Sequence, residues 1–178
     1  VTGMQRAGWW SEAPVIHVVR NAAPAAPPPS NDGAGPAPAL PTMVAVATPA
    51  QKPRIFDDWT PEDLSAHPET IEVYSNCPSV DVTLNGRALG ALSLPADGSP
   101  RQWSVTFAPG EVVASCGGTG PRDMLRTAGA AKRIVLASDD KSVGAGFDDL
   151  AFVRARVVDA KGVVVPSAEA AITFAVSD

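Results

Sequence analysis

The segment Val80-Asp81-Val82-Thr83-Leu84-Asn85-Gly86-Arg87-Ala88-Leu89-Gly90 decides the fold class of this chain. Apolar side chains alternate on both sides of the Asn85-Gly86 pair, and a period of two is typical of a strand with one buried face. Asn and Gly tolerate a positive φ, which both central residues of a type I′ turn require. The segment therefore predicts an antiparallel β-hairpin.

Short candidate strands surround this hairpin at close spacing. Apolar positions alternate through Ile71 and Val73, and again through Trp103, Val105 and Phe107, which places them on one face of each strand. Strands are therefore expected at residues 70–76, 79–84, 87–94, 102–107 and 111–116. Pro, Gly, Asn and Asp turns separate them, and this pattern predicts an all-β fold, an immunoglobulin-like β-sandwich.

The region before residue 70 contains three other patterns. Pro14–Arg20 is a β-branched run of strand length, which needs a partner strand beyond the segment that follows it. Residues 21–50 hold eight Pro and ten Ala but no aromatic residue, and this composition predicts an extended or poorly ordered linker. Thr60 followed by Pro61 predicts a single helical turn with Thr60 as its N-cap.

A second set of strands is expected after residue 128, where the apolar periodicity is interrupted. Its members are residues 133–137, 149–158, 163–166 and 171–176. An immunoglobulin-like sandwich has about seven strands, so this second immunoglobulin-like module is expected to be truncated at its C-terminus. Its uncovered apolar faces should drive pairing between copies of the chain or leave the module loosely ordered.

These patterns divide the chain into four parts. Residues 1–20 are an entry segment with the first strand, and residues 21–50 are the Ala/Pro-rich linker. Residues 51–128 form the first immunoglobulin-like module, and residues 129–178 form the partial second one. The chain starts without Met and soon reaches Trp9-Trp10. We therefore expect a segment of a longer protein, with any export signal upstream.

The composition argues against several classes of partner and cofactor. The formal net charge of −5 does not supply the clustered cations that bind nucleic acid or anionic membranes. No apolar run reaches the roughly 20 residues of a membrane span. Two His and two Cys far apart do not meet the ligand spacing of a zinc site. We therefore expect no nucleic acid, membrane, metal or cofactor.

The two cysteines, Cys77 and Cys116, lie on separate predicted strands. This placement leaves two alternatives, a buried disulfide or two buried free thiols. Cysteine is commonly buried as a small apolar residue, and on this ground the free thiols are favoured.

Three stretches resemble consecutive parts of family 2 glycoside hydrolases of the β-galactosidase type. Gly3–Arg6 together with Trp10–Val18 resembles the exit from the catalytic barrel of that family. Glu72-Val73-Tyr74-Ser75-Asn76-Cys77, followed by the Asn-Gly hairpin, resembles a β-sandwich module downstream of the barrel. Residues 132–136 and 149–166 resemble the opening half of the next, immunoglobulin-like module.

The resemblance implies an upstream barrel with two catalytic glutamates, which hydrolyses terminal β-galactosides with retention. The family's Asn-Glu acid/base motif is absent from this sequence, so no catalytic residue is expected here. The segment is expected to be a non-catalytic accessory that supports the barrel and interdomain or oligomer contacts. For the parent protein the resemblance is compatible with a periplasmic or secreted location. The alternative is a carbohydrate-binding or surface adhesion module with exposed tryptophans.

Three adjacent acid pairs invite comparison with a glycosidase site. A retaining glycosidase places two carboxyl groups roughly 5 Å apart, whereas neighbours on an extended chain point to opposite faces. We interpret Asp57-Asp58, Asp139-Asp140 and Asp148-Asp149 as turn acids. A calcium site at Asp148-Asp149 is a minor alternative.

Four residues are candidate interdomain contacts: Trp9, Trp10, His17 and Trp59. Trp9 and Trp10 lie on the entry segment and Trp59 lies in the 56–59 loop, so docking against a neighbouring domain is expected for them rather than sugar stacking. His17 lies in an apolar strand, where a hydrogen-bonded structural role is expected rather than catalysis.

Overall fold

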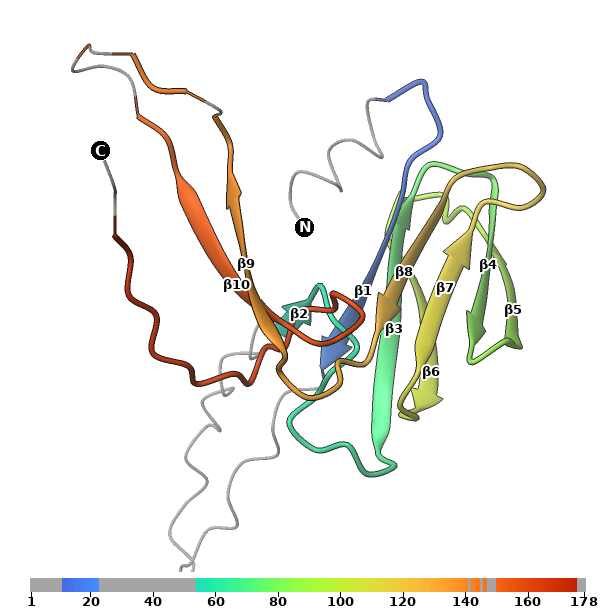
Figure 1. The fold of residues 1–178 in the computed structure, drawn as a ribbon. Coiled ribbons are helices and arrows are strands. Elements are labelled where there is room, and N and C mark those ends of the chain that lie inside the picture. Colours follow the sequence, from blue (N-terminus) through green and yellow to red (C-terminus); the bar gives the residue numbers. More distant parts are fainter. Residues whose placement is uncertain (1–10, 23–53, 141, 145, 147–149, 176–178) are drawn as a thin grey trace, which may run out of the picture.

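The structure is a computed structural model that describes residues 11–22, 54–140, 142–144, 146 and 150–175. This part of the chain is all-β, with two four-stranded antiparallel sheets and a separate two-stranded sheet (Figure 1). The first sheet has the order β2 (Arg54–Phe56), β1 (Ile16–Ala22), β3 (Pro68–Ser75) and β6 (Arg101–Thr106). The second has the order β5 (Arg87–Ser93), β4 (Ser79–Leu84), β7 (Glu111–Ser115) and β8 (Arg122–Arg126). The third is the ribbon of β9 (Arg133–Ser138) and β10 (Val153–Val158).

The Asn85-Gly86 pair forms the predicted hairpin between β4 and β5. Asn85 has a φ of 52° and Gly86 a φ of 78°, as the turn chemistry requires. The pairing then shifts, because Val82 lies opposite Gly90 while Thr83 lies opposite Ala88. Leu89 is therefore the extra residue of a β-bulge.

The hydrophobic core lies between the two four-stranded sheets. The predicted alternation is confirmed, since Ile71, Val73 and Val80 are fully buried and Trp103 is nearly so. Further core residues come from both sheets and from the loops: Ile16, Val18, Trp59, Cys77, Val82, Phe107, Val112, Ala114 and Leu125. The burial of these side chains supplies the main stabilising free energy of the sandwich.

The strand expected at 14–20 is present as β1, and it pairs with β2 and β3 on the far side of residues 23–53. It is an inner strand of the first sheet, so the sandwich includes the entry strand as well as the strands after residue 53. Neither β2 nor β8 is predicted from the sequence. β2 has only three residues, and β8 reads Arg-Asp-Met-Leu-Arg, in which charged residues mask the alternation.

The helical turn predicted after Thr60 is wrong. Residues 60–66 contain no helix and form bends. The Thr60 hydroxyl accepts a hydrogen bond from the distant Ala128 N–H at 2.9 Å instead of capping its own turn. Asp63 accepts the backbone N–H of Ser65 in a local turn, which is a common competitor of helix formation.

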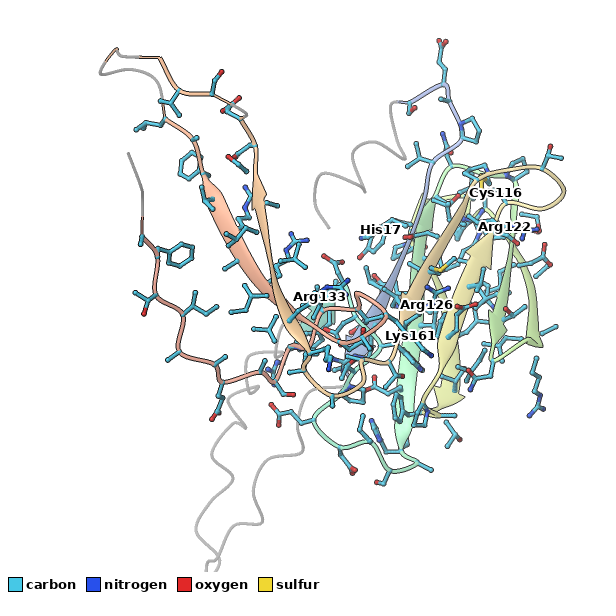
Figure 2. The ribbon with its side chains drawn as sticks, viewed as in Figure 1. His17, Cys116, Arg122, Arg126, Arg133 and Lys161 are labelled. Atoms are coloured by element: carbon cyan, nitrogen blue, oxygen red, sulfur yellow. A yellow bond between two sulfur atoms is a disulfide. The ribbon has the colours of Figure 1, made fainter. Side chains whose placement is uncertain are left out.

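The preference for free thiols is also wrong, because Cys77 and Cys116 form a disulfide. Their Cα atoms are 5.7 Å apart. Cys77 follows β3 of the first sheet and Cys116 follows β7 of the second, so the bond joins the two sheets near one end of the sandwich (Figure 2). The pairing depends on how the sheets pack, which residue spacing alone does not determine.

The β9–β10 ribbon lies beside the sandwich (Figure 1) and leaves its apolar residues exposed. Its pairing places Ile134 opposite Val157 and Leu136 opposite Ala155, so one face is apolar. Leu136 is 62% exposed and Val153 is 52% exposed. Of the strands expected after residue 158, residues 163–166 form only a single bridge, Val158 to Val164. Residues 171–175 form no strand.

Candidate interdomain junction

Asn76 pins the segment that leads into β1. Its side-chain Oδ1 accepts the N–H of Val15 at 2.8 Å. Its Nδ2 donates to the carbonyls of Ser11 and Ala13, each at 2.9 Å. One amide side chain therefore satisfies three backbone groups that lie more than sixty residues away in the sequence. This arrangement sets the direction in which the chain enters the sandwich.

The position of Asn76 is itself held by the residues on either side of it. Ser75 Oγ accepts the N–H of Cys77 at 3.1 Å, and the disulfide anchors Cys77. Arg101 is buried and donates to the carbonyls of Ser75 and Cys77, while burial lowers the pKa of its guanidinium. A buried cation bonded to backbone carbonyls in this way fixes the end of β3.

His17 joins the entry strand to both the 57–60 loop and β8. Its Nδ1 lies 3.0 Å from Asp123 Oδ2, and its Nε2 lies 3.1 Å from Asp57 Oδ1. The hydrogen bond to Asp123 raises the pKa of His17 more than burial lowers it, and Asp57 raises it further. The predicted role of His17 as a hydrogen-bonded residue is confirmed, and its side chain is 20% exposed.

Asp123 also acts on the backbone of β1. Its Oδ2 accepts the N–H of Val18 at 2.9 Å, and its Oδ1 accepts the N–H of Met124. Burial alone would raise the pKa of Asp123, but the hydrogen bonds from His17, Val18 and Met124 lower it. The Asp123 carboxylate thus supplies the acceptor that a neighbouring strand would otherwise offer to the Val18 N–H, at the place where the two sheets meet.

A second set of contacts fixes the chain where it leaves the sandwich. The Ala128 N–H donates to Thr60, as described above, and the Gly129 N–H donates to Asp159 Oδ2 at 2.9 Å. Asp159 is buried and also accepts the N–H groups of Lys161 and Val163. These hydrogen bonds lower the pKa of the Asp159 carboxyl, and the bond from Gly129 has the largest effect. The turn at the end of β10 is therefore tied to the connection that follows β8.

Trp59 has a different place from the one predicted. Its side chain is fully buried in the sandwich core, where its ring centroid lies 5.3 Å from that of Phe107. Its Nε1 donates to the carbonyl of Ala108 at 3.0 Å. A ring enclosed in this way offers no face to another domain, which corrects the interdomain contact predicted for Trp59. Trp9 and Trp10 lie outside the described residues.

The acid pairs that the structure describes form local and structural contacts. Asp57 bonds to His17, while Asp58 accepts the N–H of Thr60 and pairs with Arg20. Asp139 accepts the N–H of Phe152. Asp148 and Asp149 lie outside the described residues. Within the described part, no group of three or more His, Cys, Asp or Glu side chains could hold a metal ion. The same part contains no helix long and apolar enough to cross a membrane.

Basic residues extend from the sandwich toward the ribbon. In Figure 2 His17 lies on the side of the sandwich nearest the ribbon, and Arg126, Lys161 and Arg133 lie around the junction between the two parts. Arg126 pairs with Glu111 of the neighbouring strand through a 2.6 Å contact. Arg126 is thus engaged with the strand beside it.

Comparison with known proteins finds similarity to family 2 glycoside hydrolases. Residues 134–178 match the model of the glycoside hydrolase family 2 C-terminal domain 5, and residues 68–120 match a domain of unknown function, DUF4982. The β-galactosidase BoGH2A of Bacteroides ovatus is 30% identical over 106 residues, which cover 58% of this chain and 12% of that protein. This chain is therefore similar to C-terminal accessory domains of family 2 glycoside hydrolases.

Solved structures show a similar fold. A family 2 member from Bacteroides cellulosilyticus has a TM-score of 0.67 and 29% identity, over 90% of this chain and 20% of that one. A β-glycosidase from Bacteroides vulgatus has a TM-score of 0.57 and 22% identity, over 91% of this chain and 16% of that one, and supports the fold alone. The chain thus spans about a fifth or less of the length of these relatives.

Several residues of the candidate junction are not found by sequence reasoning. Asn76 lies inside the stretch that carries the resemblance, but nothing in its neighbourhood indicates that it binds residues 11–15. Asp123 and Asp159 resemble ordinary turn or surface acids. A signal exists only for Asp159, which precedes an Ala-Lys-Gly turn, where Asp favours hydrogen bonds to its own turn.

Proposed function

We propose that this chain is the non-catalytic support of a β-galactosidase-like family 2 glycoside hydrolase, and that it holds neighbouring domains in a defined arrangement. The observation that carries the proposal is the set of three hydrogen bonds from Asn76 to the entry segment. A single side chain bonded to backbone at three points allows little change in the entry direction. Such a contact suits a module that buttresses an upstream barrel.

The exit contacts support the same role. Thr60 and Asp159 hold the connection between β8 and β9 at Ala128 and Gly129. Hydrogen bonds therefore hold the chain where it enters the sandwich and where it leaves it, at opposite ends of the core. A disulfide also joins the two sheets. Linkers that are bonded to the modules they join transmit a fixed orientation, whereas free Gly/Ser linkers do not.

The proposal includes an immunoglobulin-like topology for the two four-stranded sheets. The chain passes from β3 in the first sheet to β4 in the second, returns to the first with β6, and crosses again to β7. A seven- to nine-stranded sandwich of the immunoglobulin type alternates between its sheets in a similar way and carries an inter-sheet disulfide. The ribbon is the start of the second such module.

The parent's activity belongs to the proposal as well. The name of the relative BoGH2A favours β-galactoside hydrolysis, and the family resemblance favours a retaining mechanism in an upstream barrel. The disulfide favours an oxidising compartment for the parent, such as a periplasm or the exterior of the cell. The exposed apolar residues of the ribbon favour contact with the barrel or with a second copy.

The test uses the 178-residue chain and the complete reading frame of its parent. The isolated chain should not hydrolyse a nitrophenyl β-galactoside, whereas the parent should. In the parent, Asn76→Ala should lower the temperature of inactivation and leave kcat at low temperature unchanged. Asn76→Asp is the companion variant, because it keeps the acceptor for the Val15 N–H but places a carboxylate oxygen against the carbonyls of Ser11 and Ala13. Its effect should therefore be at least as large as that of Asn76→Ala.

Hydrogen exchange on the isolated chain provides a second readout. Asn76→Ala should raise the exchange rate of the amide of Val15 while the amides of β4 and β7 stay protected. Hydrolysis by the isolated chain would contradict the accessory role. So would a parent that lacks this segment yet is as heat-stable and as active as the complete protein.

A further inference from the structure

A groove of about 790 Å³ lies between the sandwich and the segments that precede and follow the β9–β10 ribbon. One wall comes from β1, β2 and the loop after β2. The other comes from the connection at residues 128–130 and from residues 165–167. Small-molecule sites in proteins have similar volumes and often lie between domains. The walls of this groove are tied together by the bonds of Ala128 and Gly129 described above, so its shape is set by the fold.

Two arginines and one aromatic ring form the inner wall of the groove. The guanidinium of Arg20 lies 4.3 Å from the ring centroid of Phe56, and that of Arg54 lies 5.4 Å from it. Arg20 is buried and pairs with Glu69 and Asp58. Arg54 is exposed and forms no ion pair with a described residue. Arg54 is therefore the guanidinium with donors available to a ligand.

The acceptors of the groove are carboxylates. Asp58 uses its Oδ1 for the Thr60 N–H and for Arg20, and its Oδ2 has no hydrogen-bond partner among the described residues. Glu62 is exposed at the rim. Planar guanidinium and carboxylate groups can each bond two neighbouring hydroxyls of a sugar ring. Leu64, Val165 and Pro166 supply apolar surface for the C–H face of such a ring.

The charges that line the groove balance. Arg20 and Arg54 are cations, and Asp58 and Glu62 are anions. A site for an acidic or basic ligand carries an excess of the opposite charge, and the described residues that line this groove carry none. The arrangement of donors, acceptors and apolar surface without net charge suits a neutral polyhydroxylated ligand.

We propose that this groove binds a short neutral oligosaccharide. The site is not catalytic, because its described carboxylates are engaged with Arg20 or lie at the rim, and it would hold glycan on the accessory part of the protein. The proposal goes beyond the supporting role and does not depend on it, since it concerns a surface of this chain alone.

The experiment is a titration of the ¹⁵N-labelled 178-residue chain, followed by NMR. The probes are cellotetraose and β-1,4-galactotetraose as neutral ligands, and tri-galacturonate as an acidic one. Saturable shifts are expected at the amides of Gly129, Ala130 and Ser167 with at least one neutral probe. The double variant Arg54→Ala, Glu62→Ala should weaken that binding about tenfold, as expected for the loss of one or two hydrogen bonds.

A matched control removes one cation and one anion elsewhere. Arg87→Ala with Asp81→Ala alters exposed residues of the β4–β5 hairpin and should leave the affinity unchanged. Unchanged amide spectra outside the substituted sites show that each variant folds. Absence of shifts at millimolar concentrations of both neutral probes would overturn the proposal. Binding of the acidic probe alone, shifts remote from the groove, or equal losses in the two double variants would also overturn it.

Discussion

His17 Nδ1 lies 3.0 Å from Asp123 Oδ2, and this contact links an inner strand of one sheet to the edge strand of the other. The same carboxylate oxygen accepts the Val18 N–H. An unpaired backbone donor at a partly buried sheet edge would be costly. The pair therefore joins the two sheets where their edges meet. The protonation of His17 should for this reason affect the stability of the whole module.

The free energy of unfolding should fall as the pH rises from about 6 to about 8. The folded state raises the pKa of His17, mainly through Asp123, so its stabilising effect is complete below the pKa of the unfolded chain. The effect is lost as the pH rises through the raised pKa. Asp123 has a lowered pKa, so its contribution is lost only at acidic pH. Urea denaturation across this range measures the slope.

The variant Asp123→Asn separates this effect from other titrations. It should lower the pKa of His17, as read by NMR, and reduce the unfolding free energy near pH 6 by about 1–2 kcal/mol. His67 is the other histidine of the chain, and the Ser65 carbonyl and Glu69 raise its pKa too. His67→Gln is thus the required control. If the pH slope vanishes in His67→Gln and persists in His17→Gln, the assignment to His17 is incorrect.

The disulfide should make a large contribution to stability. Cys77 and Cys116 are 39 residues apart, and closing a loop of that length in the unfolded chain corresponds to about 4 kcal/mol in the chain-entropy model. The double variant Cys77→Ala, Cys116→Ala should unfold at a correspondingly lower guanidinium concentration. A thiol assay of the denatured, unreduced protein should detect no free cysteine. One free thiol or more per chain would contradict the bond.

Gly110 should be far less replaceable than Gly86, although both have positive φ. An added Cβ at Gly110 would lie 1.8 Å from Asn85 Oδ1, the atom that accepts the Glu111 N–H. An added Cβ at Gly86 meets nothing within 4 Å. Gly110→Ala should therefore cost about 3 kcal/mol, and Gly86→Ala about 1 kcal/mol. Thermal unfolding of the two variants measures the difference, and equal shifts would refute the clash.

Trp59 should behave as a core residue. Trp59→Ala should reduce the unfolding free energy by about 4 kcal/mol because it leaves a cavity. Trp59→Phe should cost about 1 kcal/mol or more, since the Ala108 carbonyl loses its donor. Denaturant unfolding of both variants measures these losses. A neutral effect of Trp59→Ala on the isolated chain would indicate a surface role instead.

The apolar face of the ribbon should promote association between copies. Leu136→Lys places a charge on that face and should reduce self-association in sedimentation velocity. Val135 lies on the opposite face, paired with Arg156, so Val135→Lys is the matched control and should have a smaller effect. A wild-type chain that stays monomeric at high concentration would contradict this prediction.

Most strands of the sandwich could be predicted, whereas most of the junction could not. β4 occupies residues 79–84, as expected, and β3, β5, β6 and β7 differ from their predicted bounds by one or two residues. Their patterns repeat every two residues and are limited by Asn, Gly and Pro, so the information is local. β8 is not predictable, because the charged Arg122, Asp123 and Arg126 obscure the alternation of apolar residues. Asp123 is also the partner of His17.

The amino-acid order alone therefore determined the β-hairpin, the alternation of buried and exposed side chains along the strands, and the all-β class. Each of these depends on residues adjacent in the chain. Only the tertiary structure decided that Trp59 is a core residue, that Cys77 and Cys116 are bonded, and that Asn76 holds the entry segment. Those contacts join groups 39 to 65 residues apart. They exist only after two sheets have packed on a common core, and no local pattern specifies which distant group will meet which.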